Sequence, residues 1–267
     1  MRALAVIGSL SRDVVEGAAA RIGGAPWYAG RALHALGQEA IIFAKCGDPD
    51  RARYQRRLAT LGLPASLVAG GETTSFSFTY AADGTRSMTV ERIGEPWRTD
   101  EPQGMLLRSI EWLQVAPLLR SDFDAAALER IGLGRKLMLD AQGLVRVPEA
   151  GPLRLDANYD PDLLRHVAIL RLAEEEAVVL TGSSEPEALA ELGVPEVVLT
   201  LGEKGSAIVA GGHVEHVPAR PVGGGADPTG AGDAFGAAYL SARADGHAPA
   251  SAARRATALV AALLMGR

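Results

Sequence analysis

The chain of 267 residues is poor in cysteine, lysine, asparagine and aromatic residues. Its one cysteine, Cys46, excludes an internal disulfide, and a chain of this length buries enough surface to fold without one. Lysine occurs only at positions 45, 136 and 204, so arginine carries most of the positive charge. The net charge of −5 argues against a nucleic-acid partner, because such proteins usually carry an excess of basic residues.

Long hydrophobic runs are also absent. The longest candidate, residues 256–265, is interrupted by Thr257 and is far shorter than the ~18 residues of a membrane span. The apolar run at residues 3–7 ends at Gly8, too early for the core of a signal peptide. We therefore expect a cytoplasmic protein that has no membrane partner.

The rest of the composition is that of a globular protein, with 48% hydrophobic and 22% charged residues. Short apolar runs alternate with helical patterns along the chain. The expected strands are residues 4–7, 40–43, 112–115, 136–139, 167–170 and 197–201. The expected helices are residues 29–36, 49–61, 122–131, 231–244 and 250–265. This alternation predicts a single α/β domain over residues 1–267, with a doubly wound, mainly parallel sheet sandwiched by helices.

One region has the two-residue period of a half-buried strand. Between residues 73 and 90, Phe76, Phe78 and Tyr80 alternate with polar residues, and Met88 and Val90 do so after the dipeptide Asp83-Gly84. An Asp-Gly dipeptide between alternating segments predicts a β-hairpin. We expect a small β flap, or lid, on the α/β body, and residues 14–22 are a second candidate for part of it.

The segment richest in chemical information runs from Gly223 to Leu240. A glycine loop leads directly into an Ala-rich helix, whose first turn presents free N–H groups and the positive end of the helix dipole. Such a site suits a phosphate, and small residues let the backbone approach it closely. Asp233 lies in the same turn, where the dipole should keep it ionised as a proton acceptor. The alternative is an ordinary capped helix start whose glycines serve only the turn.

Other nucleotide-binding patterns do not fit. The chain has no Gly-x-x-x-x-Gly-Lys-Ser/Thr sequence, which excludes a P-loop. The dinucleotide-binding pattern also fails, because Phe235 stands where a third glycine is needed and no strand precedes the loop. His213 and His216 would lie on opposite faces of an exposed strand, so we expect no metal site there.

The run Asp-Pro-Thr-Gly-Ala-Gly-Asp at residues 227–233, followed by Ala-Phe-Gly-Ala-Ala-Tyr-Leu, closely resembles the C-terminal signature of the ribokinase-like, PfkB-type carbohydrate kinases. The resemblance implies that Asp233 deprotonates the acceptor hydroxyl. It also implies that the backbone of Gly230, Ala231 and Gly232 forms an anion hole, and that Thr229 contacts the nucleotide.

The N-terminal part is similar to the same family. Residues 8–13 resemble its first strand, where the aspartate, here Asp13, binds substrate hydroxyls. Gly23 and Gly24 resemble the paired glycines that face the sugar. Tyr28 stands where ribokinase has an asparagine, which argues against ribose and keeps nucleosides and cyclitols open as acceptors.

Further matches concern the phosphate donor. Residues 199–205 look like the nucleotide loop of the family, which assigns Thr200, Gly202 and Gly205 to ATP. A plain strand-turn-strand is the alternative. Glu176 falls where the family has a glutamate that binds Mg²⁺ through water, although Ala173 replaces the usual asparagine. Three consecutive glutamates at a helix start also simply complement the helix dipole.

Residues 140–146 follow a strand and resemble a subset of the family that includes inositol-type kinases. Gln142 and Arg146 are therefore candidates for contact with the substrate, the alternative being an ordinary surface loop.

The resemblance extends over essentially the whole chain. It implies an ATP- and Mg²⁺-dependent kinase that phosphorylates a hydroxyl of a small sugar, polyol or nucleoside, as a monomer or a homodimer. A dependence on a monovalent cation stays open. Two alternatives also stay open: a catalytically inactive regulator that binds nucleotide or sugar, and a hydroxymethylpyrimidine-type kinase of similar fold.

Overall fold

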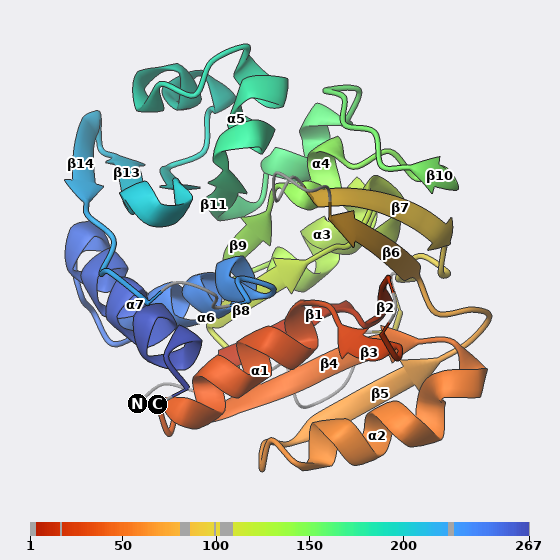
Figure 1. Ribbon diagram of the computed structural model, residues 1–267. Helices are drawn as coiled ribbons and strands as arrows, with labels where there is room; N and C mark the ends of the chain where they lie inside the picture. The colour runs from red at the N-terminus through yellow and green to blue at the C-terminus, as the bar shows by residue number, and fades with distance from the viewer. Residues whose placement is uncertain are drawn as a thin grey trace.

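The computed structural model describes residues 4–16, 18–80, 86–98, 100–101, 109–223 and 227–266. Its largest element is a nine-stranded sheet, seen in Figure 1 with helices packed along it. Six of its strand pairs are parallel, and only the pairs at the β14 end are antiparallel. In spatial order the strands are β14 (His213–Val217), β13 (Ser206–Ala210), β12 (Glu196–Thr200), β11 (Val167–Ala173), β9 (Lys136–Asp140), β8 (Trp112–Ala116), β1 (Leu4–Ser9), β4 (Ala40–Cys46) and β5 (Ala65–Ala69).

Helices cover both faces of this sheet, as the alternating sequence pattern predicts. The helices are α1 (Ala25–Ala35), α2 (Arg51–Ala59), α3 (Ala125–Gly132), α4 (Gln142–Val145), α5 (Glu174–Thr181), α6 (Ala231–Ala244) and α7 (Pro249–Leu264). Short 3-10 helices are η1 (Asp48–Asp50), η3 (Arg120–Asp122), η4 (Pro161–Leu164), η5 (Pro186–Leu192) and η6 (Gly202–Lys204).

The central strands are apolar throughout because each of their faces is buried. In β1, Leu4 and Val6 point into the core on the side of α1, α6 and α7, whereas Ala5 and Ile7 point into the core on the side of α3 and α5. Successive side chains of a strand face opposite ways, so one apolar run supplies both cores. The predicted doubly wound, mainly parallel architecture is therefore confirmed.

A second sheet of five strands stands at one end of the molecule (Figure 1). Its spatial order is β10 (Gly151–Pro152), β7 (Arg86–Arg92), β6 (Ser75–Tyr80), β2 (Ser11–Val15) and β3 (Arg21–Gly23). The predicted hairpin strands are confirmed as the antiparallel pair β6 and β7, while the Asp83-Gly84 turn lies outside the described residues. Phe76, Phe78 and Val90 pack on Leu118 and Leu119 of the main body, so this sheet shares a core with it.

Some elements differ from the sequence-based prediction. Residues 48–50 form a 3-10 turn, and α2 begins only at Arg51, later than the predicted start at residue 49. The helix predicted from residue 122 begins at Ala125, where the Asp124 side chain accepts a hydrogen bond from the Ala127 N–H. Strands β5 and β10 were not predicted, because β5 lies at a sheet edge and β10 is only two residues long.

Within the described part of the chain, none of the helices has the length and apolar character that crossing a bilayer demands.

The core supplies a direct stability test. Leu113 in β8 is fully buried, so Leu113→Ala should lower the free energy of unfolding by about 2–5 kcal/mol through lost contacts and a residual cavity. Urea denaturation followed by circular dichroism measures this. Leu133→Ala is the matched control, since Leu133 is 73% exposed and its loss should change stability by less than about 0.5 kcal/mol. Equal losses in the two variants would contradict this description of the core.

Candidate active site

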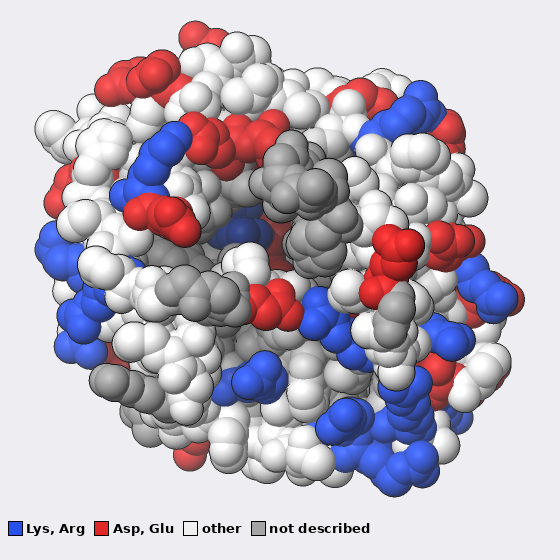
Figure 2. Space-filling view, in the orientation of Figure 1, with Lys and Arg blue, Asp and Glu red and all other residues white. Residues whose placement is uncertain are grey.

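A cavity of about 230 Å³ lies where the N-terminus of α6 meets the C-terminal ends of the central strands and the five-stranded sheet. Figure 2 shows this face hollowed near its centre, with side chains of both charges inside the hollow. The cavity is lined by Ser11, Asp13, Gly24, Tyr28, Phe76, Phe78, Met88, Leu118, Gln142, Arg146, Arg171, Ala173, Glu175, Glu176, Pro228, Thr229, Gly230, Gly232 and Asp233. Parallel α/β sheets bind ligands at this end of their strands.

The start of α6 forms one wall of the cavity. Gly230 precedes the helix with φ of 78°, a conformation that a residue with a Cβ rarely adopts. A Cβ at this position would also lie 2.1 Å from the ring of Tyr28. The backbone can therefore turn sharply into α6, where the Ala231 N–H donates to the Pro228 carbonyl at 2.9 Å.

Asp233 lies in this first turn and is half-buried at the cavity wall. Burial raises the pKa of its carboxyl group to about 7, the negative charge of Asp140 adds to this effect, and the positive charges of Arg171 and Arg146 oppose it. This direction runs against the expectation that the helix dipole keeps Asp233 ionised, because burial favours the neutral form of the carboxyl group. A carboxyl group with such a pKa is well suited to general base catalysis.

Asp13 reaches the cavity from β2 in the five-stranded sheet. Its carboxylate is buried and accepts a hydrogen bond of 2.7 Å from the Ser11 hydroxyl. Gly23 lies directly behind it, since a Cβ there would be 2.1 Å from Asp13 Oδ2. Gly23 thus makes room for Asp13, whereas Gly24 lines the cavity itself.

Arg171 is a residue that sequence analysis missed. It is the charged side chain within the otherwise apolar strand β11, and it is buried. Its Nη1 donates a hydrogen bond of 2.5 Å to Asp140 on the neighbouring strand β9. The signal in the sequence was an arginine inside a run of apolar residues, a position where a charge requires a partner.

Glu176 lines the cavity from the first turn of α5 and is also buried. Its carboxylate accepts a hydrogen bond of 2.8 Å from the Ala173 N–H, so it caps the helix. Burial raises the pKa of Glu176, while Arg171 and Arg146 lower it. Glu175 lines the same cavity, and one or two carboxylates with retained water are the usual protein contribution to a Mg²⁺ site. These residues fit a hydrated Mg²⁺.

A second hollow of about 520 Å³ lies between α5 and the turn after β12. Its lining residues are Ala173, Glu174, Glu175, Val178, Ser184, Thr200, Leu201 and Gly202. The Thr200 hydroxyl donates to the Leu172 carbonyl, and Lys204 forms an exposed ion pair with Glu174. Both hollows share Ala173 and Glu175, so they are neighbours on the surface of the protein.

The structure brings most of the predicted site residues to these two hollows. Asp13, Gly24, Gln142, Glu176, Thr229, Gly230, Gly232 and Asp233 line the central cavity, and Thr200 and Gly202 line the second hollow. Gly23, Ala231 and Gly205 line neither. Gly205 packs instead beneath β14, since a Cβ there would lie 2.1 Å from the Val217 carbonyl oxygen.

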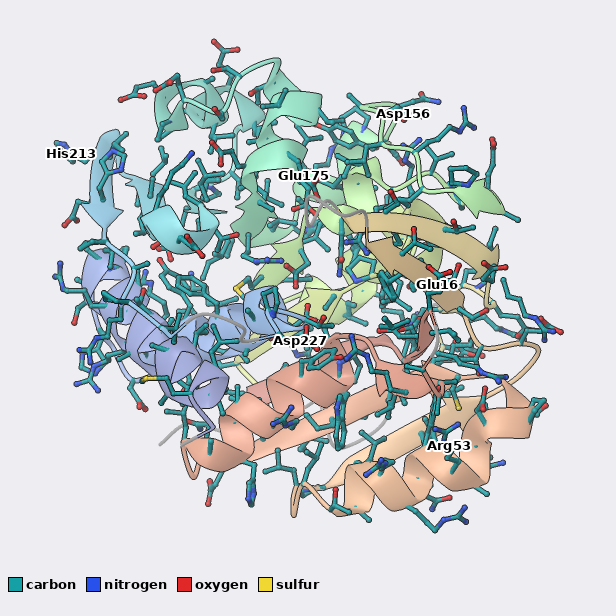
Figure 3. All side chains as sticks on the ribbon, in the orientation of Figure 1. Glu16, Arg53, Asp156, Glu175, His213 and Asp227 are labelled. Atoms are coloured by element: carbon teal, nitrogen blue, oxygen red, sulfur yellow. The ribbon has the colours of Figure 1, made fainter. Side chains whose placement is uncertain are left out.

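A polar bridge joins the five-stranded sheet to the loop before α6. Arg21 of β3 donates to Asp227 at 2.8 Å and to the Thr229 hydroxyl at 3.2 Å. Figure 3 labels Asp227 in this loop and Glu175 in α5. The bridge connects this sheet to the loop that leads into α6.

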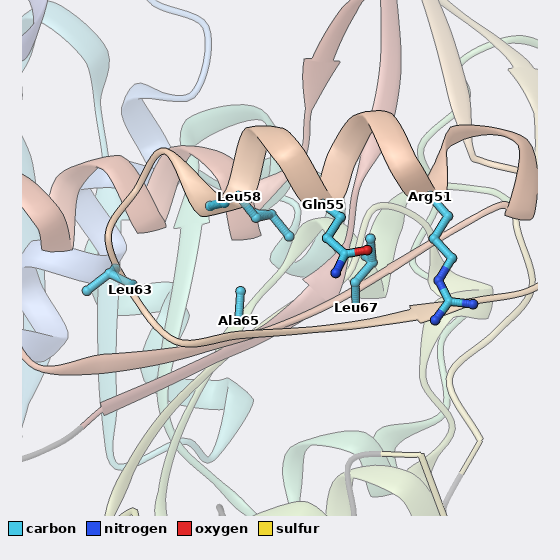
Figure 4. A pocket seen from close by; sticks show the side chains of 7 residues that line it. Arg51, Gln55, Leu58, Leu63, Ala65 and Leu67 are labelled. Carbon is cyan, nitrogen blue, oxygen red and sulfur yellow. The ribbon is translucent and has the colours of Figure 1, made fainter.

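A third hollow of about 240 Å³ lies far from this site, between α2 and β5 (Figure 4). It is lined by Arg51, Gln55, Leu58, Ala59, Leu63, Ala65 and Leu67. These side chains include no acid or nucleophile, and we assign no catalytic role to it.

Comparison with known proteins gives one family. The model described as "pfkB family carbohydrate kinase" matches residues 7–266. A structure of a pyrophosphate-dependent kinase in the ribokinase family, complexed with a pyrophosphate analog and myo-inositol, is 22% identical with a TM-score of 0.85, and the match covers 99% of this chain and 95% of that one.

Two further structures have the same fold. A ribokinase from Thermotoga maritima is 17% identical with a TM-score of 0.73, over 99% of this chain and 93% of that one. A nucleoside kinase from Burkholderia thailandensis, in complex with inosine, is 18% identical with a TM-score of 0.73, over 99% and 91% of the two chains.

Proposed function

The chain belongs to the pfkB family of carbohydrate kinases, and we propose that it transfers the terminal phosphoryl group of ATP to a hydroxyl of a small, uncharged polyol. The observation that carries this proposal is the meeting of two carboxylates with a helix N-terminus. Asp13 and Asp233 line one cavity together with Gly230 and Gly232. A hydroxyl held there is close to both a base and a site for phosphate.

In the proposed reaction Asp13 accepts a hydrogen bond from the acceptor and orients it. Asp233 removes the proton of the hydroxyl that attacks the terminal phosphorus. The N–H groups at the start of α6 stabilise the negative charge of the transferred group. The five-stranded sheet lines the cavity with the apolar side chains of Phe76, Phe78 and Met88. In the proposed reaction they exclude water, so that ATP is not hydrolysed.

Glu176, with Glu175, is the proposed Mg²⁺ site. Bound through water, the ion would neutralise charge on the donor phosphates. Thr200 and Gly202 in the second hollow are the proposed contacts for the rest of the nucleotide, with Thr229 close to the phosphates.

The lining of the cavity favours a compact cyclic acceptor. Its volume of about 230 Å³ is below the roughly 300–1,000 Å³ that drug-sized ligands occupy. Tyr28, Phe76 and Phe78 offer apolar ring faces, while Asp13 and Gln142 offer hydrogen bonds. The complex of the similar kinase with myo-inositol supports a cyclitol as the first acceptor to test.

The donor and acceptor are tested together with purified protein and Mg²⁺. We expect transfer from ATP to myo-inositol, detected by mass spectrometry, with weaker transfer to ribose and to a nucleoside. Pyrophosphate must be the second donor, because the similar structure is a pyrophosphate-dependent kinase. Transfer from pyrophosphate and not from ATP would show that pyrophosphate is the phosphate donor. No transfer from either donor, with ligand-induced rises in melting temperature, would favour the inactive regulator.

Asp233→Asn tests the base. The amide cannot take a proton, so kcat should fall by about 10²–10⁴-fold while ATP binding persists. Asp245→Asn is the matched control, since Asp245 is an exposed carboxylate at the other end of α6. Near-normal turnover by the Asp233 variant would remove the assignment.

The raised pKa of Asp233 predicts a pH dependence. Since the base acts only when deprotonated, kcat/KM should fall as the pH drops below about 7. Initial rates between pH 5 and 9, at fixed ionic strength, measure this limb. A rate that stays constant down to about pH 4, the ordinary range of an aspartate, would contradict the raised pKa.

A further inference from the structure

The ion pair with Asp140 does not account for all the N–H groups of the buried Arg171 guanidinium. Only 8% of the Arg171 surface is exposed, yet the residue lines the central cavity. Taking a guanidinium out of water carries a large free-energy cost unless its N–H groups are paired. Its Nε is buried and has no hydrogen-bond partner among the described residues.

The two terminal nitrogens of Arg171 point to different neighbours. Nη1 binds Asp140, which is itself completely buried and also accepts a hydrogen bond of 3.3 Å from Gln114. Nη2 lies against the first turn of α6: a Cβ on Gly232 would be only 2.0 Å from it. Asp140, which Gln114 also contacts, thus holds the guanidinium from the core side, and Nη2 lies beside the first turn of α6.

The charges around the cavity explain why a fixed cation is needed there. Four carboxylates line it, from Asp13, Glu175, Glu176 and Asp233, against two guanidinium groups. An excess of negative charge repels the phosphates of a donor. Arg171 is the guanidinium whose nitrogen lies next to Gly232.

We propose that Arg171 contacts the phosphoryl group in transfer, with Nη2 donating to it beside Gly232 while Asp140 holds Nη1. This inference rests on the proposed function. In the step, the acceptor oxygen forms a bond to the terminal phosphorus and its proton passes to Asp233. The bond from that phosphorus to the bridging oxygen breaks, and the electron pair leaves with ADP. Arg171 stabilises the negative charge on the group between the two oxygens.

The first test measures binding and is independent of turnover. Pyrophosphate serves as the probe, because it carries the two terminal phosphates of a donor, and calorimetry follows its binding to the whole protein with Mg²⁺. Arg171→Met should weaken pyrophosphate binding about tenfold or more. Arg171→Lys should weaken it less, because lysine keeps the positive charge although it lacks the forked N–H groups of the guanidinium. Arg171→Met combined with Asp140→Asn leaves no unpaired carboxylate in the core and should bind as weakly as Arg171→Met.

The second test measures turnover. Arg171→Met should lower kcat by about 10³-fold or more, with the acceptor KM little changed, as for other arginines that contact a transferred phosphoryl group. Added guanidinium ion should restore part of the rate to Arg171→Ala, which a loss of core packing would not permit.

The pH profile provides a third readout. The groups that act on Asp233 are Asp140 and Asp13, which raise its pKa, and Arg171 and Arg146, which lower it. Removing Arg171 should therefore move the acid limb of kcat/KM to higher pH.

The control is Arg243→Met. Arg243 binds the buried Glu196 at 2.8 Å from the last turn of α6, so its loss also breaks a partly buried ion pair, but away from the cavity. It should lower stability and leave pyrophosphate binding and kcat unchanged. The proposal would be overturned if the folded double variant bound pyrophosphate as tightly as the wild type. It would also be overturned if the wild type itself bound no pyrophosphate. If the wild type binds pyrophosphate but phosphorylates no acceptor, the proposed kinase function is refuted. Weaker pyrophosphate binding by the Arg171 variants would then still support a contact between Arg171 and phosphate.

Discussion

Negative charge concentrated under one helix N-terminus is the constraint on which the site depends. Asp140 is buried beneath α6, and Asp233 lies in its first turn, so the negative charge of Asp140 disfavours ionisation of Asp233. The Arg171 guanidinium offsets this repulsion through its ion pair with Asp140. The pKa of Asp233 therefore depends on the balance between burial and the charges of Asp140 and Asp13, which raise it, and the charges of Arg171 and Arg146, which lower it. A value near neutrality combines a usable fraction of base with sufficient basicity.

The two sheets contribute different parts of the site. Strands β9 and β11 of the large sheet end at the cavity and bring Asp140 and Arg171 together across neighbouring strands. The five-stranded sheet contributes Asp13 and the apolar rings on the opposite side. Arg21 connects the two through Asp227, so the five-stranded sheet is linked to the loop that leads into α6. A movement of one would affect the other.

The parts that sequence predicted are those determined by local pattern. The apolar runs with both faces buried predicted the large sheet, and the long signature around Asp233 predicted the start of α6. Arg171 was missed because its meaning depends on Asp140, 31 residues earlier and adjacent only through strand pairing. The packing of Gly205 against the carbonyl of Val217 in β14 likewise depends on strand pairing, and its predicted contact with the nucleotide stays a prediction. Residues that meet through strand pairing can be separated by any number of positions, so a single sequence gives no fixed spacing by which to recognise their contact.

The charge of the cavity also constrains which molecules fit the proposed reaction. An acidic excess opposes an acceptor that already carries a phosphate or carboxylate, whereas a neutral polyol gains hydrogen bonds to Asp13 without repulsion. The donor is a polyanion and meets the same excess, so it needs cations of its own. A hydrated Mg²⁺ at Glu176 and the fixed guanidinium of Arg171 would supply them. The same carboxylates that orient a neutral acceptor would thus make transfer depend on a cation-bound donor.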